Sequence, residues 1–303
     1  MNLDLKRKLL IFRRDAGEEE LTSQQLIYGA LRDLAYAIRP TLTYILCTMT
    51  LLFLGFLMVG LGFGVEEYVN RFGNFFVTLG TFLTFHRLFS KSKKAGHTFF
   101  EDASLYHENL SFKKTVGAWI FGIGASLAVS AVISLLPRVG AVGVYADKVS
   151  NIYKQWDVFL SLAASVLFTP LVEEIIFRGY MLNRLLVKWD ERAAMIATTL
   201  IFAILHGSSI WFIYTFFMGW VIGRLSIRED NIFYGIFMHS GFNLTSTVLW
   251  LIYINYPGSQ EALAGNKFLI FLLGLMGGLA AFLMWRLYKN STGAGSAITG
   301  KTV

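Results

Sequence analysis

Residues 41–64 contain no charged side chain, and this run constrains the fold more than any other feature of the sequence. About 20 consecutive apolar residues are enough for a helix to cross the hydrocarbon core of a bilayer. A surface helix of a water-soluble domain, in contrast, alternates an apolar stripe with a charged face. Further runs of this kind follow along the 303 residues. The sequence therefore predicts an all-α membrane protein.

The composition supports this prediction, because 55% of the residues are hydrophobic and 16% are charged, against roughly 25% charged in an ordinary soluble domain. An ordinary cytosolic enzyme is excluded. The net charge of +7 comes from lysines and arginines between the apolar runs, where such residues flank a bilayer, so we expect no nucleic-acid partner. Cys47 is the single cysteine, which excludes a disulfide framework and a cysteine-based zinc site within one chain.

Eight runs are read as transmembrane helices, which predicts a polytopic, multi-pass protein. They are residues 41–64, 72–86, 115–136, 158–183, 193–208, 210–223, 231–254 and 268–285. With the N- and C-termini in the cytoplasm, 21 of the 27 lysines and arginines lie on the cytoplasmic side and 5 on the outer side. Omitting the weakest span, 72–86, would reduce this asymmetry to 15 against 11. The positive-inside rule therefore favours eight spans.

Around these spans we expect a cytoplasmic N-terminal segment, 1–40, and a flexible C-terminal tail, 289–303, with the transmembrane domain at 41–288. Apolar residues recur at helical spacing in 24–39, before Pro40, so this helix lies either on the membrane surface or in solvent. A polar loop is expected at 87–114. The apolar run 9–12 is too short for a signal peptide. The absence of a signal and the small size suit a prokaryotic plasma membrane.

Three charged residues lie inside the fourth predicted span: Glu173, Glu174 and Arg178. Ionisable groups within a membrane cost several kcal/mol each unless they are paired or functional. Glu174 and Arg178 are four residues apart and share a face of an α-helix, so they can pair. Glu173 points about 100° away and can face another helix. One carboxylate could therefore be structural and the other chemical.

Two predicted spans carry a histidine, namely His206 and His239, and Asn243 lies one turn after His239. At 1.5 Å per residue, these side chains and Glu173 lie about 12 to 21 Å from the predicted cytoplasmic ends of their helices. All four therefore reach the middle of the membrane from three different helices. Together with Glu174 and Arg178, this common depth predicts a functional site.

Glutamates, histidines and an asparagine suit the activation of water and its attack on a carbonyl group, which is hydrolysis. In one arrangement, Glu173 and His206 orient and deprotonate a water molecule while His239 and Asn243 donate hydrogen bonds to the oxyanion. In the other, His206, His239 and a glutamate such as Glu173 bind Zn²⁺, and the second glutamate is the base. The sequence leaves both arrangements open. Zn²⁺ is the expected cofactor only in the second, and no cofactor is expected in the first.

Three motifs in this order resemble the CPBP family, which comprises CAAX prenyl endopeptidases and bacteriocin-processing proteins and is also called the Abi family. The motifs are EExxxR (Glu173, Glu174, Arg178), FxxxH (Phe202, His206) and HxxxN (His239, Asn243). The resemblance covers about 158–254, the expected catalytic core. It implies a multi-helix intramembrane endopeptidase whose Glu, His, His and Asn form a site that is metal-dependent or that uses a glutamate-activated water. Eukaryotic members cleave the last three residues from isoprenylated CaaX proteins, and some prokaryotic members act in bacteriocin self-immunity or peptide maturation.

The predicted function is therefore that of a CAAX-protease-like intramembrane endopeptidase, surrounded by membrane lipids and acting on a peptide or membrane-protein substrate. Two alternatives from other classes stay open. A non-catalytic scaffold or bacteriocin-immunity-type protein would bind a membrane-protein partner through the N-terminal segment or the 87–114 loop. A transporter would use the buried glutamates and histidines to relay protons. The absence of HExxH, and of aspartate from every predicted span, argues against intramembrane proteases of the HExxH and aspartyl types. A serine–histidine pair that uses Ser126 is harder to exclude, although a serine in a membrane helix is usually a packing residue.

Overall fold

The computed structural model describes residues 23–61, 65–94, 98–103, 110–136, 162–207, 209–256 and 265–289, together with residues 96, 105, 258, 259 and 262. Within these ranges the chain is helical and contains no β-sheet, so the predicted all-α fold is confirmed there. Residues 290–303 of the predicted flexible tail and the first 22 residues lie outside the described ranges, whereas Lys289, predicted to begin the tail, is the last residue of a helix. The chain divides into two compact units, Met1–Ala103 with Ile175–Ile201, and Ser104–Glu174 with Phe202–Val303.

The first unit is built from helices of two separate stretches of the chain. They are α2 (Ser23–Ala37), α3 (Arg39–Gly60), α4 (Val65–Lys94), α5 (Phe99–Asp102), η2 (Ile175–Leu182), α10 (Asn183–Leu186) and most of α11 (Glu191–Leu205). Helix α2 begins one residue before the helix predicted at 24–39 and ends two residues before its predicted end. Pro40 lies in the first turn of α3, where its fixed φ and missing N–H are tolerated.

Helix α4 is longer than the span predicted at 72–86. Its 30 residues continue to Lys94, and its last turn carries Lys91, Lys93 and Lys94, which the negative end of the helix dipole favours. Helix α5 follows at once, and Thr98 and Glu101 form a capping box at its N-terminus. The prediction of a polar loop over 87–114 is therefore wrong for 87–94, 99–102 and 112–114, because the polar side chains there terminate and cap helices.

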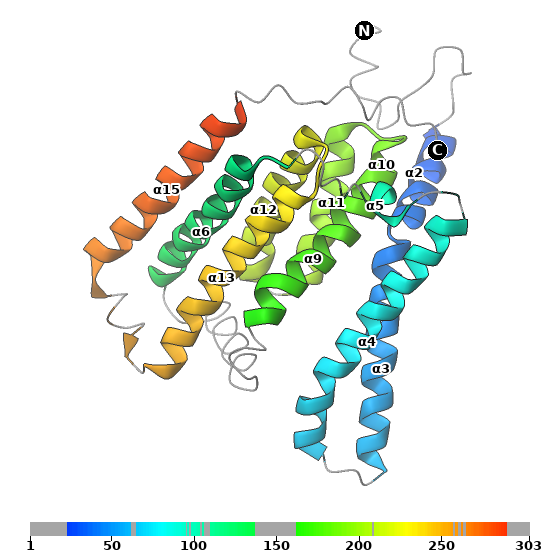
Figure 1. The fold of residues 1–303 in the computed structure, drawn as a ribbon, viewed down its shortest axis with the longest axis horizontal. Coiled ribbons are helices and arrows are strands. Elements are labelled where there is room, and N and C mark those ends of the chain that lie inside the picture. Colours follow the sequence, from blue (N-terminus) through cyan, green and yellow to red (C-terminus); the bar gives the residue numbers. More distant parts are fainter. Residues whose placement is uncertain are drawn as a thin grey trace, which may run out of the picture. The chain divides into compact units, whose positions relative to one another are not determined.

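The second unit contains the helices that carry most of the predicted site. They are α6 (Phe112–Ser134), η1 (Ala163–Phe168), α9 (Thr169–Glu174), the last turn of α11, α12 (Ser209–Glu229), α13 (Phe233–Asn255) and α15 (Lys267–Lys289). In Figure 1, α6 lies beside α13 and α15, and α13 also contacts α12, α9 and η1. Helix α13 is therefore the element around which this unit is assembled.

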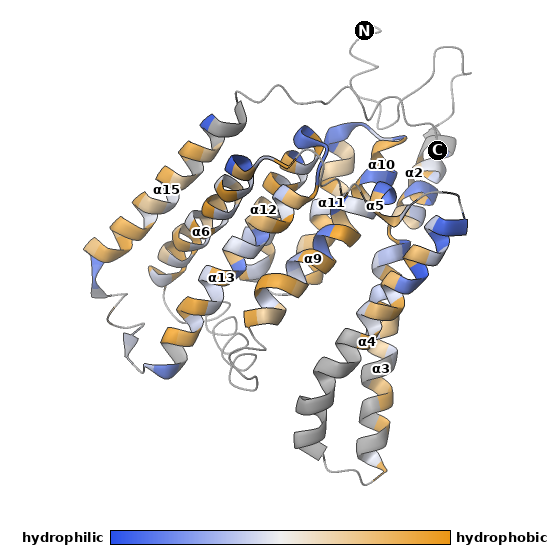
Figure 2. Ribbon diagram, in the orientation of Figure 1, coloured by the Kyte–Doolittle hydropathy of each residue, from blue (hydrophilic) through white to orange (hydrophobic). Residues whose placement is uncertain are grey.

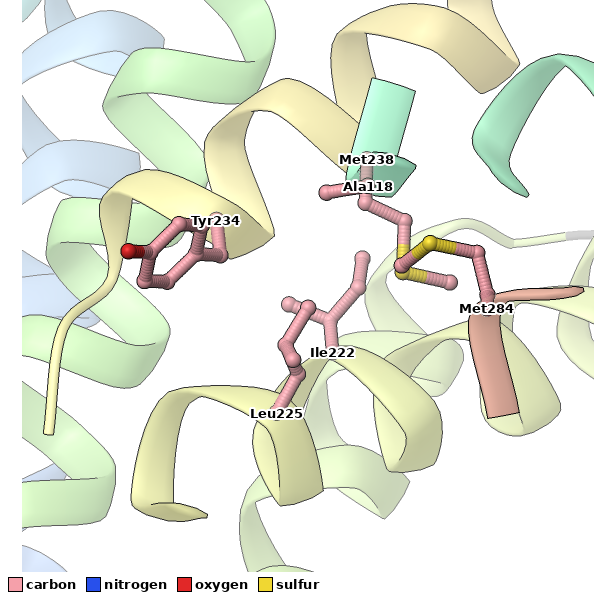
Figure 3. Packing of buried hydrophobic residues seen from close by; sticks show 6 residues of the cluster. All are labelled: Ala118, Ile222, Leu225, Tyr234, Met238 and Met284. Carbon is pink, nitrogen blue, oxygen red and sulfur yellow. The ribbon is translucent and has the colours of Figure 1, made fainter. Parts of the chain in front are cut away.

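A buried apolar cluster from four helices holds α13 in place. Figure 3 shows its side chains: Ala118 from α6, Ile222 and Leu225 from α12, Tyr234 and Met238 from α13, and Met284 from α15. Burying side chains of this size stabilises the fold by about 1.5–3 kcal/mol each relative to exposure to water. Met238 directly precedes His239, so the rotation of α13 that buries Met238 also sets the direction of the His239 side chain.

Two glycines let α6 and α13 approach closely. A Cβ atom on Gly122 would overlap the backbone oxygen of Met238, and a Cβ atom on Gly241 would overlap the backbone oxygen of Trp119. Only residues without a side chain fit between the two backbones. The distance between α6 and α13 is therefore set by these positions.

We expect Gly122→Ala to destabilise the protein by about 3 kcal/mol, because the added methyl group meets backbone rather than a flexible side chain. The matched control is Gly274→Ala in α15, where nothing lies within 4 Å of the added atom. Thermal unfolding of both variants in the same detergent measures the difference. A melting temperature of Gly122→Ala equal to that of the wild type would contradict the observed helix packing.

Each of the eight predicted spans overlaps a helix, but described residues at the ends of four spans are not helical, namely 61, 135–136, 206–207 and 231–232. Residues 62–64, 158–161 and 208 of the predicted spans lie outside the described ranges. Three helical segments in the described ranges are long and apolar enough to cross a membrane: Phe112–Ser134, Ile210–Glu229 and Lys267–Met284. Figure 2 shows α6 and α15 as hydrophobic over most of their length. These segments support an integral membrane protein. The full set of eight spans and the cytoplasmic termini stay predictions.

Candidate active site

Glu173 and Glu174 end helix α9, which lies between two π-helical segments, η1 and η2. A π-helix has a wider turn than an α-helix, is rare, and occurs frequently at functional sites. In a π-helix the backbone hydrogen bonds join residues five apart instead of four. Side chains and carbonyl groups therefore take directions that regular α-helical spacing does not predict. The pair of carboxylates is thus presented by an irregular helix.

Glu174 makes a hydrogen bond to His239 of α13. Its Oε1 atom accepts from Nδ1 of the imidazole at 2.9 Å, the Glu174 side chain is 0% exposed and that of His239 is 10% exposed. The carboxylate lies beside Gly235, where an added Cβ atom would be in ordinary contact with Glu174 Oε2 at 3.6 Å. Since a carboxylate accepts the Nδ1 proton, it fixes the orientation of the ring and directs Nε2 the other way.

The opposite ring nitrogen of His239 faces Glu173. The distance from Nε2 to Glu173 Oε2 is 3.8 Å, too long for a hydrogen bond. Oε2 of Glu173 is buried and has no hydrogen-bond partner in the structure. Leaving a buried polar atom without a partner is costly, so this oxygen is the natural place for a water or substrate hydrogen.

Phe202 joins the two histidines of the site. Its ring lies 4.6 Å from the ring of His206 and 6.1 Å from the ring of His239, measured between centroids. Nδ1 of His206 lies 2.7 Å from the backbone oxygen of Phe202. Because a carbonyl oxygen only accepts, Nδ1 carries the proton and Nε2 of the neutral ring is left as an acceptor. His206 directly follows the end of α11 at Leu205, and Gly207 after it has φ +70°, a left-handed conformation that is common just after a helix.

Asn243 is held by the first π-helical segment. Its side-chain nitrogen donates to the backbone oxygen of Ser165 at 2.8 Å, and the Ser165 hydroxyl lies 3.0 Å from the hydroxyl of Thr247. The amide nitrogen of Asn243 has a second hydrogen for another acceptor. Ser165 and Thr247 were not predicted as site residues, because serine and threonine are common in membrane helices and nothing in their spacing distinguishes them.

Arg178 lies in η2 and therefore in the first unit, whereas the other five predicted site residues lie in the second. Its side chain is 1% exposed. The expected pairing with Glu174 assumed α-helical spacing across both residues, but α9 ends at Glu174 and the π-helix begins at Ile175. That pairing stays a prediction.

The predicted zinc ligands are only partly brought together. Glu173 and His239 approach each other as described, but His206 does not complete a set with them. No three His, Cys, Asp or Glu side chains within the described part of the chain are grouped so that they could hold a metal ion. Zinc in catalytic sites takes three protein ligands at about 2.0–2.2 Å. As they lie in the described part of the chain, these side chains do not form such a three-donor set, so no reaction step is routed through Zn²⁺, and the zinc arrangement stays a prediction.

Together, the fold and this cluster define an all-helical protein with apolar helices and an internal acid–base group of two carboxylates and two imidazoles. The family model described as Type II CAAX prenyl endopeptidase Rce1-like matches residues 155–245, a segment that includes all six predicted site residues. This match confirms the resemblance predicted from the three motifs and supports a CAAX-protease-like intramembrane peptidase in general. No curated protein and no solved structure matched the chain.

Proposed function

We propose that this protein hydrolyses a peptide bond near the C-terminus of a CaaX-type substrate within the membrane, with Glu173 as the general base. The observation that carries the proposal is the imidazole of His239 between two carboxylates. Glu174 fixes one ring nitrogen at 2.9 Å, and the buried, unbonded Oε2 of Glu173 lies 3.8 Å from the other. A base of this kind, held in a water-poor site, suits the removal of a proton from water.

The proposed reaction uses four side chains of the site. Oε2 of Glu173 takes one proton from a water molecule, whose other O–H group donates a hydrogen bond to Nε2 of His206. The water oxygen bonds to the peptide carbonyl carbon, and the carbonyl oxygen becomes an oxyanion. His239, protonated on both nitrogens, donates from Nε2 to this oxyanion, and the second hydrogen of the Asn243 amide is a further donor. When the C–N bond breaks, Glu173 returns the proton to the departing amine.

The test is cleavage of a fluorogenic CaaX-type peptide by the detergent-purified protein, with and without a chelator. We expect cleavage that a chelator does not inhibit, because His206 does not join Glu173 and His239 in a ligand set. Elemental analysis of the wild type beside Glu173→Ala and His206→Ala is the second measurement. Near-stoichiometric zinc that both variants lose, with chelator-sensitive cleavage, would contradict the metal-independent reaction.

The scaffold alternative predicts a different outcome. If the polar cluster only held helices together, Glu173→Ala would reduce assembly or stability, and no preparation, the wild type included, would cleave the peptide. Retention of the full cellular phenotype by variants of the proposed base would favour this alternative over hydrolysis.

A further inference from the structure

Three cationic side chains gather around one tyrosine in the first unit. Arg39 at the start of α3, Lys91 near the end of α4 and Arg184 in α10 lie 5.3, 5.9 and 4.7 Å from the centre of the Tyr36 ring. Nη1 of Arg184 also donates to the backbone oxygen of Tyr36 at 3.3 Å. The sequence places the three cations far apart, so the fold itself brings them together.

No carboxylate pairs with these three cations among the described residues. The nearest acidic side chain of the helix, Asp33, is engaged by Lys188 at 3.4 Å and Arg32 at 3.5 Å. Like charges around one ring repel each other, and the ring face of Tyr36 offsets this repulsion by about 0.5–1 kcal/mol per cation at an exposed site. Arg184 gains further compensation, from the backbone oxygen of Tyr36 and from the longer-range charge of Asp102. The cluster of Arg39, Lys91 and Arg184 is therefore poised for an anion.

The apolar surface beside this cluster indicates what kind of anion. Starting from Arg39, exposed apolar side chains follow at three- and four-residue spacing along α3: Leu42, Leu46, Met49 and Phe53. Residues at this spacing share one face of a helix. Helix α2, which leads into the cluster, also exposes Ile27, Tyr28 and Leu31. A cationic head above an apolar stripe matches a phospholipid rather than a free phosphate.

We propose that Arg39, Lys91 and Arg184 form a binding site for the headgroup of an anionic phospholipid, whose acyl chains lie along the exposed face of α3. All three cations belong to segments predicted to flank the membrane on the cytoplasmic side, where such lipids attract basic residues. The site lies in the first unit and does not depend on the proposed hydrolysis.

The experiment is a titration of the full-length protein in detergent with short-chain phosphatidylglycerol, followed by thermal unfolding and by native mass spectrometry. Phosphatidylcholine with the same acyl chains controls for net charge, and glycerol 3-phosphate controls for the acyl chains. We expect saturable stabilisation and one retained lipid with phosphatidylglycerol. Equal stabilisation by phosphatidylcholine would overturn the proposal, and full stabilisation by glycerol 3-phosphate would assign the site to a soluble phosphate instead.

Variants assign the effect to the cluster. Each cation near a membrane surface changes the affinity for an anionic lipid by about fivefold, so Arg39→Gln with Lys91→Gln should weaken binding about 25-fold. Lys93→Gln on the same helix is the matched control and should bind as the wild type does. If the double variant fails to fold, Lys91→Gln alone, at an exposed position, should show the fivefold loss. Unchanged binding by either variant would refute the site.

A second set of variants distinguishes the lipid from the chain's own acidic residues. Glu18, Glu19 and Glu20 precede α2 in the sequence and could neutralise the cluster instead. If replacing all three with glutamine lowered the melting temperature as much as removing the cations, and phosphatidylglycerol had no effect, the cluster would be closed by the chain and the proposal would be wrong.

Discussion

Glu173→Gln is expected to lower the rate of peptide cleavage about 10³-fold while leaving the melting temperature close to that of the wild type. Glutamine keeps the size of the side chain and its hydrogen-bonding capacity, but it cannot take a proton from water. A positioned general base typically contributes 10²- to 10⁴-fold. Because Oε2 of Glu173 makes no hydrogen bond in the structure, its replacement breaks none, and the loss should appear in kcat.

The matched control is Glu191→Gln, which makes the same chemical change in the first turn of α11, away from the acid–base cluster. Both proteins are compared by cleavage of the fluorogenic peptide and by thermal unfolding in one detergent. Wild-type activity in Glu173→Gln would show that Glu173 is not the general base, and the proposed reaction would be wrong. A large loss of stability would instead assign Glu173 a structural role.

His239→Ala is expected to destabilise the protein by about 3–5 kcal/mol in addition to abolishing cleavage. The carboxylate of Glu174 is 0% exposed, and the imidazole of His239, at 2.9 Å, is its partner. Removing one member of a buried pair leaves the other charge poorly compensated, which is the expensive change. For a chain of this size the melting temperature should fall by roughly 10 °C.

A double-mutant cycle measures the coupling between the two side chains. The double variant Glu174→Ala with His239→Ala should cost less than the sum of the single variants, because neither partner is then left behind. Unfolding is followed in the same detergent for all four proteins. Additive losses would show that the two residues do not stabilise each other, contrary to the short contact in the structure.

The positions of the helices could be predicted from the sequence because long apolar runs report directly on helical segments. The span at 231–254 corresponds to α13, and that at 268–285 falls within α15. The full length of α4 could not be predicted, because hydropathy measures where a helix is apolar and not where its backbone hydrogen bonds stop. Lysines that were read as a loop extend this helix instead.

The candidate site was only partly predictable. The residue types and their depth indicated that Glu173, His206, His239 and Asn243 could meet, but not which nitrogen faces which oxygen. The pairing of Glu174 with Arg178 along one helix stays a prediction, and the hydrogen bond from His239 to Glu174 is a contact that the sequence did not indicate. Such contacts depend on the rotation of α13, which distant packing residues fix.

The π-helical winding on both sides of α9 makes the site sensitive to chain length as well as to side-chain identity. A π-helix holds one more residue than the α-helical turn it replaces, so η1 carries a residue that regular winding would not accommodate. Losing one residue from Ala163–Phe168 would let the segment return to α-helical winding and turn one flank relative to the other by about 100°. Ser165, which holds Asn243, and the two glutamates that follow would then face different directions. The number of residues in η1, and not only their identity, therefore determines whether Ser165 and the two glutamates face the site.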